Sequence, residues 1–147
     1  MKISLEQLPE FASNFLKDLS ENPTNQNQAL LICLSGNLGA GKTTFTQQIA
    51  KLLNVEETIT SPTFVLMKKY SISFGQFKNL IHIDAYRIED PNELNILKFS
   101  EICDDPENLI LLEWPEKVEE VLPKERTTIT FEVADENSRE INIFKNV

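Results

Sequence analysis

The chain has 147 residues, of which 41% are hydrophobic, and its formal net charge is −9. The length fits one domain over residues 1–147 with a buried core, and no apolar run approaches the ~18–20 residues of a membrane span. Because the N-terminus also lacks a signal pattern, we expect a cytoplasmic protein without membrane contact. The negative net charge argues against a protein that binds nucleic acid without a partner protein, because contacts to phosphate dominate such binding.

The first predicted element is an N-terminal helix. Apolar residues recur at helical spacing across residues 5–19, and Ser4 and Gln7 have the spacing of a capping box. Pro9 would remove a hydrogen bond from the second turn. The regular helix is therefore expected to begin near Leu8, with Pro9 at its first position, and to serve as a packing element.

A glycine-rich stretch over residues 36–43 comes next, between an apolar run at residues 30–34 and a predicted helix at residues 43–53. The stretch fits the pattern G-x-x-x-x-G-K-[ST] and holds three of the four glycines in the chain. A strand, a glycine loop and a helix in this order are the context in which the pattern forms a phosphate-binding P-loop. The alternative is a chance glycine-rich turn with a surface lysine.

The backbone of a P-loop cradles phosphate. Its successive N–H groups form an anion nest, and the unpaired N–H groups at the start of the helix add to it. Lys42 can reach the β- and γ-phosphates, and Thr43 can offer its hydroxyl to Mg²⁺. The residues predicted to contact the nucleotide are Asn37, Leu38, Gly39, Ala40, Gly41, Lys42, Thr43 and Thr44.

A short polar segment at residues 60–64 follows the helix. In P-loop proteins a hydroxyl-bearing loop at this place often senses the γ-phosphate and Mg²⁺, which makes Ser61 and Thr63 candidates for that role. An ordinary turn stiffened by Pro62, with solvated hydroxyls, accounts for the segment equally well.

Two predicted strands at residues 64–72 and 80–83 flank a connection and indicate a hairpin, so the sheet should be mixed. The connection between them contains Gly75. His82 is the only histidine and lies inside the second strand. A packed or hydrogen-bonded side chain is favoured there over a metal ligand, because no second ligand type clusters with it.

The second half of the chain alternates helices and strands. A helix is predicted at residues 90–103, a buried strand at 109–112, a short helix at 116–122, and an antiparallel hairpin from strands at 127–133 and 140–144. The predicted fold class is therefore α/β, a P-loop NTPase-like three-layer fold. Its mixed central sheet would have a parallel core and antiparallel hairpin strands.

Two acidic residues follow predicted strands directly. They are Asp84 and Glu113, and ligand crevices in α/β proteins open at the carboxyl ends of strands. One of them would hold Mg²⁺ through oxygen ligands and the other would orient or activate water, or each is only a polar strand-end residue or helix cap. Trp114, which follows Glu113, is by default a core or interface residue.

Four separated segments resemble one family. They are residues 36–45, 61–64, 82–87 and 113–116, which read GNLGAGKTTF, SPTF, HIDAYR and EWPE. In order and spacing they are similar to the bacterial tRNA threonylcarbamoyladenosine biosynthesis ATPase family, TsaE or YjeE, over about residues 3–135. The resemblance implies a protein that binds ATP with Mg²⁺ and hydrolyses it slowly. It also implies two partner proteins, a transferase subunit and its paralogous scaffold, which modify the adenosine beside the tRNA anticodon, so that tRNA is contacted only indirectly.

The resemblance further implies roles for the candidate catalytic residues Lys42, Asp84 and Glu113. Lys42 would contact phosphate, Thr43 and Glu113 would bind Mg²⁺, and Asp84 would serve water activation or site closure. Trp114 would lie beside the nucleotide and help at the partner interface. The switch-like loop would contain Ser61 and Thr63.

The chain departs from the family pattern in two places. Asn37 stands where the family usually has an acidic residue, and we expect a small effect because that side chain points away from the nest in most P-loops. Residues 94–99 contain no glycine, whereas the family tends to have one there. The second departure concerns how the local helix ends and not the site.

Two other functions stay open on the sequence. A stand-alone small-molecule kinase usually needs a lid with several arginines, and this chain has only Arg87, Arg126 and Arg139. A nucleotide-gated binding module would use the same loop without meaningful turnover. Nucleotide turnover and tRNA modification, measured with and without the two partners, would separate these functions.

Overall fold

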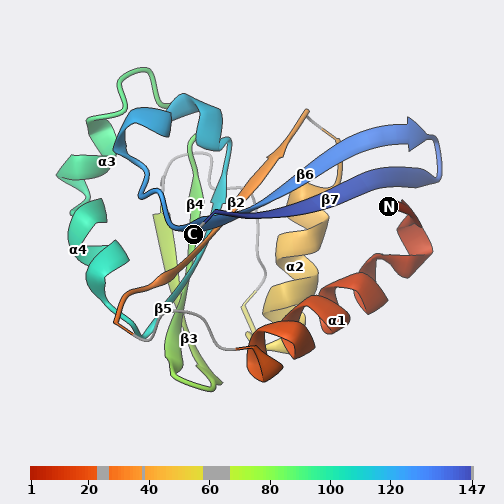
Figure 1. Ribbon diagram of the computed structural model, residues 1–147, viewed down its shortest axis with the longest axis horizontal. Coiled ribbons are helices and arrows are strands. Elements are labelled where there is room, and N and C mark those ends of the chain that lie inside the picture. Colours follow the sequence, from red (N-terminus) through yellow and green to blue (C-terminus); the bar gives the residue numbers. More distant parts are fainter. Residues whose placement is uncertain (23–26, 38, 58–66, 147) are drawn as a thin grey trace.

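The computed structural model describes residues 1–22, 27–37, 39–57 and 67–146. Within them, helices pack on both faces of a seven-stranded mixed sheet whose strand order is β1-β7-β6-β2-β5-β4-β3 (Figure 1). The strands are β1 (Lys2–Ser4), β2 (Leu30–Gly36), β3 (Met67–Phe74), β4 (Phe77–Asp84), β5 (Asn108–Glu113), β6 (Arg126–Asp135) and β7 (Ser138–Asn146). The helices are η1 (Leu5–Gln7), α1 (Leu8–Glu21), α2 (Lys42–Leu52), α3 (Glu93–Ile96), α4 (Phe99–Asp104), η2 (Pro115–Lys117) and η3 (Glu119–Val121).

The sheet has a parallel core. β2 pairs in parallel with β5 on one side and with β6 on the other, and β4 pairs in parallel with β5. β2 and β5 are continuous apolar runs because both of their faces are covered. Antiparallel pairs add β3 to β4, β7 to β6 and β1 to β7. The predicted α/β class with a mixed sheet of parallel core and antiparallel hairpins is confirmed.

Alternate residues of the central strands enter two different cores. On one face, α1 and α2 cover the sheet (Figure 1), and Phe45 of α2 is fully buried there. Its ring lies 5.9 Å from Phe11, 5.8 Å from Phe15 and 5.7 Å from Phe131, measured between centroids. Such edge and tilted contacts are the favoured geometries of aromatic pairs. This cluster fixes α2, and with it the loop that precedes α2.

On the opposite face, α3 and α4 cover the sheet (Figure 1). Cys33 of β2 lies in this second core and is completely buried, and so are Ile83 of β4 and Leu112 of β5. No helix in the described part of the chain is long and apolar enough to cross a membrane.

Several elements differ from the sequence-based predictions. The capping pair begins η1, where the Ser4 N–H donates to Gln7 Oε1 at 2.9 Å, and α1 then begins at Leu8 as expected. The single helix predicted at residues 90–103 is divided, because Lys98 adopts a left-handed conformation with φ 61°. The helix predicted at 116–122 is two 3₁₀ turns, interrupted by the non-helical backbone of Val118. β1 was not predicted from the sequence.

Candidate phosphate-binding cleft

The glycine stretch forms the turn between β2 and α2. Gly36 ends β2 beside β6, where a Cβ atom would lie 2.4 Å from the Phe131 carbonyl oxygen, so only glycine fits. Gly41 caps α2 with a φ of 111°, which a side chain rarely tolerates. The two glycines therefore let the chain leave a buried strand and start a helix within a few residues. The first N–H groups of α2 are left for a ligand.

Lys42 is the first residue of α2 and is 4% exposed. Its Nζ donates a hydrogen bond to the Gly36 carbonyl oxygen and lies 3.5 Å from the centroid of the Trp114 ring. Burial lowers the pKa of Lys42, and the nearby carboxylates of Glu113, Glu116 and Asp84 act against that shift. The loop, the indole face and these carboxylates thus hold one buried cation at the end of β2.

A chain of polar contacts leads from α2 across the sheet. The Thr43 hydroxyl donates to Glu113 Oε1 at 3.3 Å, and Glu113 Oε2 lies 2.6 Å from His82 Nε2. Glu113 is 2% exposed and His82 is fully buried. His82 lies in β4 and Glu113 at the end of β5, so the parallel register of these two strands brings them together. The contacts fix both carboxylate oxygens of Glu113.

The second predicted acid, Asp84, lies beside Glu113 in the register of β4 and β5. Its Oδ1 accepts a hydrogen bond of 3.0 Å from the backbone N–H of Tyr86. Tyr86 also contacts Trp114, with ring centroids 5.0 Å apart. The Ala85 N–H donates to the Glu113 carbonyl oxygen at 3.0 Å, which ties the ends of the two strands together.

These groups line one cleft of about 310 Å³. It brings together eight residues that the sequence predicted for the site: Gly39, Gly41, Lys42, Thr43, Thr44, Asp84, Glu113 and Trp114. Asn37 and Ala40 instead line a different cavity, between the loop and the end of β6. The predicted contacts Leu38, Ser61 and Thr63 lie outside the described residues.

Three residues that also line this cleft were not predicted from the sequence. They are Leu5, Tyr86 and Arg139. Tyr86 lies within a segment that was singled out and could have been found two positions after Asp84. Leu5 and Arg139 carry no such signal, because only the pairing of β1 with β7 brings the two ends of the chain to the loop.

The cleft offers oxygen donors that suit Mg²⁺. These are the Thr43 hydroxyl and the carboxylates of Glu113 and Asp84. Among the described residues, no group of three or more His, Cys, Asp and Glu could hold a metal ion by itself.

The comparisons with known proteins converge on one description. The family model "Threonylcarbamoyl adenosine biosynthesis protein TsaE" matches residues 4–141. The chain is 40% identical over 117 residues to the tRNA threonylcarbamoyladenosine biosynthesis protein TsaE of Rickettsia felis, an alignment that covers 79% of this chain and 66% of that protein. It is 36% identical over 143 residues to the protein of the same name from Rickettsia prowazekii, covering 97% and 91% of the two chains.

The protein of that name from Bacillus subtilis is 38% identical over 112 residues, or 76% of this chain. The alignments with it and with the Rickettsia felis protein span just under two thirds of those proteins. Among solved structures, the crystal structure of YdiB from Bacillus subtilis superposes with a TM-score of 0.69 at 30% identity. That match covers 100% of this chain and 84% of the YdiB chain.

Proposed function

The chain belongs to the TsaE family of threonylcarbamoyl adenosine biosynthesis proteins, and from this premise we propose that it is an ATPase of tRNA threonylcarbamoyladenosine formation. In this proposal the fold is a P-loop NTPase-like domain over residues 1–147. It binds ATP with Mg²⁺ and hydrolyses the nucleotide slowly.

One observation carries the proposal. The cleft has the glycine turn and the buried ammonium group of Lys42 on one side, and the carboxylates of Asp84 and Glu113 on the other. Phosphoryl transfer depends on positioning and on neutralising charge, so a phosphate cradle that faces two acids suits hydrolysis of a polyphosphate. A neutral ligand would require neither the positively charged cradle nor the two carboxylates.

Each group of the cleft has its own role in binding and hydrolysing the nucleotide. Lys42 and the N–H groups of the loop bind the β- and γ-phosphates, while Thr43 and Glu113 would hold Mg²⁺. When bound, the ion supplies positive charge beside the phosphate oxygens. Glu113 is held in one orientation by the imidazole of His82 and the hydroxyl of Thr43. Asp84, the neighbour of Glu113 in the strand register, would orient or activate the attacking water.

The partners in this proposal are other proteins of the same pathway. We propose the transferase subunit and its paralogous scaffold, with tRNA held by them and not by this chain. The acidic net charge of −9 supports indirect contact with RNA. The exposed Tyr86 and the half-buried Trp114, which both line the cleft, are suited to report the bound nucleotide to a partner.

ATP turnover and tRNA modification, each measured with and without the two partner proteins, test the function. We expect slow turnover alone and faster turnover in the complex. Lys42→Ala should lower ATP affinity at least about tenfold, and Asp84→Ala should lower turnover on the order of 10²-fold. Lys17→Ala, on the exposed face of α1, is the matched control and should change neither quantity.

Three outcomes would contradict the proposal. Equal turnover with and without partners would refute a coupled ATPase. Intact tRNA modification by both Asp84→Ala and Glu113→Ala, with loss in Lys42→Ala, would identify a nucleotide-gated binding module. A phosphorylated metabolite formed on incubation with cell extract would identify a kinase.

A further inference from the structure

The two oxygen atoms of the Glu113 carboxylate have different surroundings. Oε1 accepts a hydrogen bond of 3.3 Å from the Thr43 hydroxyl of α2, and Oε2 lies 2.6 Å from Nε2 of His82 in β4. Thr43 and Glu113 line the cleft, whereas His82 is fully buried and is not among the lining residues. Oε1 is therefore the oxygen on the side of the cleft, and Oε2 is turned to the imidazole within the sheet.

The imidazole is enclosed by the core that α1 and α2 cover. His82 pairs with Leu111 in the strand register, so both side chains face this core, as does Leu80 two residues before His82. The Nδ1 atom of His82 is buried and has no hydrogen-bond partner within the described residues. A proton on Nδ1 would be a buried donor without an acceptor, which is costly. The ring therefore carries its proton on Nε2 and donates it to Glu113 Oε2.

This hydrogen bond restricts how Glu113 can meet a metal ion. To bind an ion with both oxygens, the carboxylate would have to turn Oε2 toward the cleft and away from His82. The Nε2–H group would then be a buried donor without a partner. Thr43 imposes no such limit at Oε1, because its hydroxyl can donate its proton to the carboxylate and keep its lone pairs for an ion. One oxygen of Glu113 can thus bind an ion while the other is held by the protein.

We propose that His82 is a positioning residue that makes Glu113 bind the metal ion through Oε1 alone, and that it thereby favours Mg²⁺ over Ca²⁺ in the cleft. The proposal rests on the proposed function, in which Thr43 and Glu113 hold Mg²⁺. Magnesium requires near-octahedral oxygen ligands at about 2.0–2.1 Å, whereas calcium takes about six to eight oxygens at about 2.3–2.6 Å and accepts both oxygens of one carboxylate. A carboxylate with one oxygen already held suits the smaller ion, and hydrogen-bond partners of metal ligands commonly tune metal sites in this way.

Titration calorimetry with a non-hydrolysable ATP analogue tests this in three buffers, which contain Mg²⁺, Ca²⁺ or a chelator. The wild type is compared with His82→Leu and His82→Phe, which remove the donor, and with His82→Gln, whose amide N–H can still donate to Oε2. The measured quantity is the ratio of the dissociation constants in Ca²⁺ and in Mg²⁺. Comparing this ratio between variants cancels the affinity of each ion for the free analogue.

The expected result is a change in metal preference and not a general loss of binding. The wild type should bind the analogue more tightly in Mg²⁺ than in Ca²⁺. His82→Leu and His82→Phe should lower this preference about tenfold, the lower end of the effect of losing such a partner, and His82→Gln should keep it within about threefold of the wild type. Binding in chelator should be the same in every variant, because no ion then uses Glu113.

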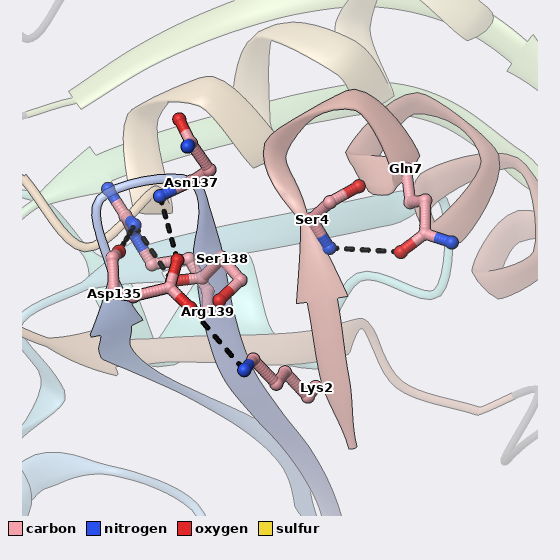
Figure 2. A network of polar contacts seen from close by, with 7 residues as sticks. All are labelled: Lys2, Ser4, Gln7, Asp135, Asn137, Ser138 and Arg139. Carbon is pink, nitrogen blue, oxygen red and sulfur yellow. Dashed lines mark hydrogen bonds and ion pairs between the residues drawn. The ribbon is translucent and has the colours of Figure 1, made fainter.

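Two controls separate this contact from a general loosening of the fold. Leu111→Ala opens the core beside His82 and lowers stability, but it leaves the hydrogen bond between His82 and Glu113 in place. Lys2→Met breaks an ion pair of 3.3 Å with Asp135 at the turn between β6 and β7, and Lys2 does not line the cleft (Figure 2). Both variants should keep the wild-type ratio, and thermal melts show which variants are folded.

The outcomes separate the proposal from the function on which it rests. An unchanged ratio in His82→Leu or His82→Phe, whichever is folded, would overturn the proposal, and so would an equal fall of the ratio in His82→Gln. Equal weakening in all three buffers would show that His82 only supports the fold. A wild type that binds the analogue equally well in Mg²⁺ and in Ca²⁺ would also contradict it. A wild type that binds no analogue in any buffer would instead refute the proposed function itself.

Discussion

At the scale of single residues, the contact between His82 and Glu113 is the one on which the cleft depends most. Both side chains are buried, and the carboxylate accepts a 2.6 Å hydrogen bond from the imidazole. In His82→Leu the Oε2 atom of this buried carboxylate would lose its hydrogen-bond donor, and breaking such a pair costs about 3 kcal/mol. We expect the free energy of unfolding to fall by about that amount, as measured by urea unfolding with the fluorescence of the single tryptophan.

A double-mutant cycle distinguishes this pair from ordinary packing. His82→Leu combined with Glu113→Leu removes both polar groups, so the double variant should lose clearly less stability than the sum of the two single losses. Strictly additive losses would show that the two side chains are not coupled. Glu113→Gln is the matched control, because the amide oxygen still accepts a hydrogen bond from the imidazole.

The two cysteines give a second prediction at this scale. Burial raises the pKa of the Cys33 and Cys103 thiols from an ordinary value near 9 to about 12. At pH 8 the thiolate fraction is therefore about 10⁻⁴ in the native protein and about 0.1 in the unfolded chain. A colorimetric disulfide reagent should react about a thousandfold more slowly with native protein than with protein in urea. If the native protein reacted fast with the reagent and the Cys103→Ser variant did so too, the prediction of a slow reaction at Cys33 would be contradicted.

The same shift affects stability at alkaline pH. Between pH of about 9 and about 12 the unfolded thiols have lost their protons and the buried ones have not, so the unfolded state binds fewer protons. Stability must then fall as pH rises through this range. Unfolding midpoints in urea, measured from pH 8 upward, should decline for the wild type and decline less for Cys33→Ala.

At the scale of elements, the boundary between α3 and α4 is set by one backbone conformation. Lys98 is exposed and has φ 61° and ψ 40°, a left-handed conformation that favours glycine. It lies in the stretch where the family resemblance leads one to expect a glycine. We therefore predict that Lys98→Gly stabilises the protein by about 0.5–1 kcal/mol, because relief of strain exceeds the entropy cost of glycine. Urea unfolding measures the difference.

A neighbouring position supplies the control for this prediction. Ser100 is also exposed but lies inside α4, where glycine carries only its entropic cost. Ser100→Gly should therefore destabilise the protein by about 0.5 kcal/mol. If both substitutions lowered stability equally, strain at Lys98 would not be what divides the two helices.

The elements show which parts of a fold a sequence can predict. β2 and β5 were predictable because strands buried on both faces are continuous apolar runs. β1 was not, because three residues are too few to show a period. The hairpin of β6 and β7 was predicted from alternation, but its parallel attachment to β2 was not. Periodicity indicates which residues face inward, but it does not indicate which strand lies beside them.

The same distinction applies to the cleft. The glycine loop and the two acids could be predicted because a local pattern or a strand end marks each of them. The partner of His82 could not, since 31 residues separate the pair and only the register of β4 and β5 joins them. Arg139 is 100 residues from Gly39, whose carbonyl group it contacts. Long-range strand pairing, which leaves no local signal, completes the cleft.

At the scale of the whole molecule, charge limits which partners the chain can meet directly. The net charge is −9, and several basic side chains are already paired with acids, as Lys2 with Asp135, Lys78 with Glu107 and Lys145 with Asp18. Binding to tRNA gains most of its free energy from cations that neutralise phosphates. A surface of this kind should repel the RNA, so it is the partners that would hold tRNA.

We therefore predict that the isolated protein does not retard tRNA in a native gel at about 0.15 M salt, the condition at which nonspecific binding is normally still weak. The same tRNA should be retarded when the transferase subunit and its scaffold are added. Adding this chain to them should change how the retardation depends on nucleotide, and it should leave the affinity of the complex for tRNA unchanged. Retardation by the chain alone that weakens steeply with salt would contradict this. The slope of log affinity against log salt concentration would then give the number of phosphates that the chain neutralises. The acidic surface would have to contain a local basic patch strong enough to overcome the net charge.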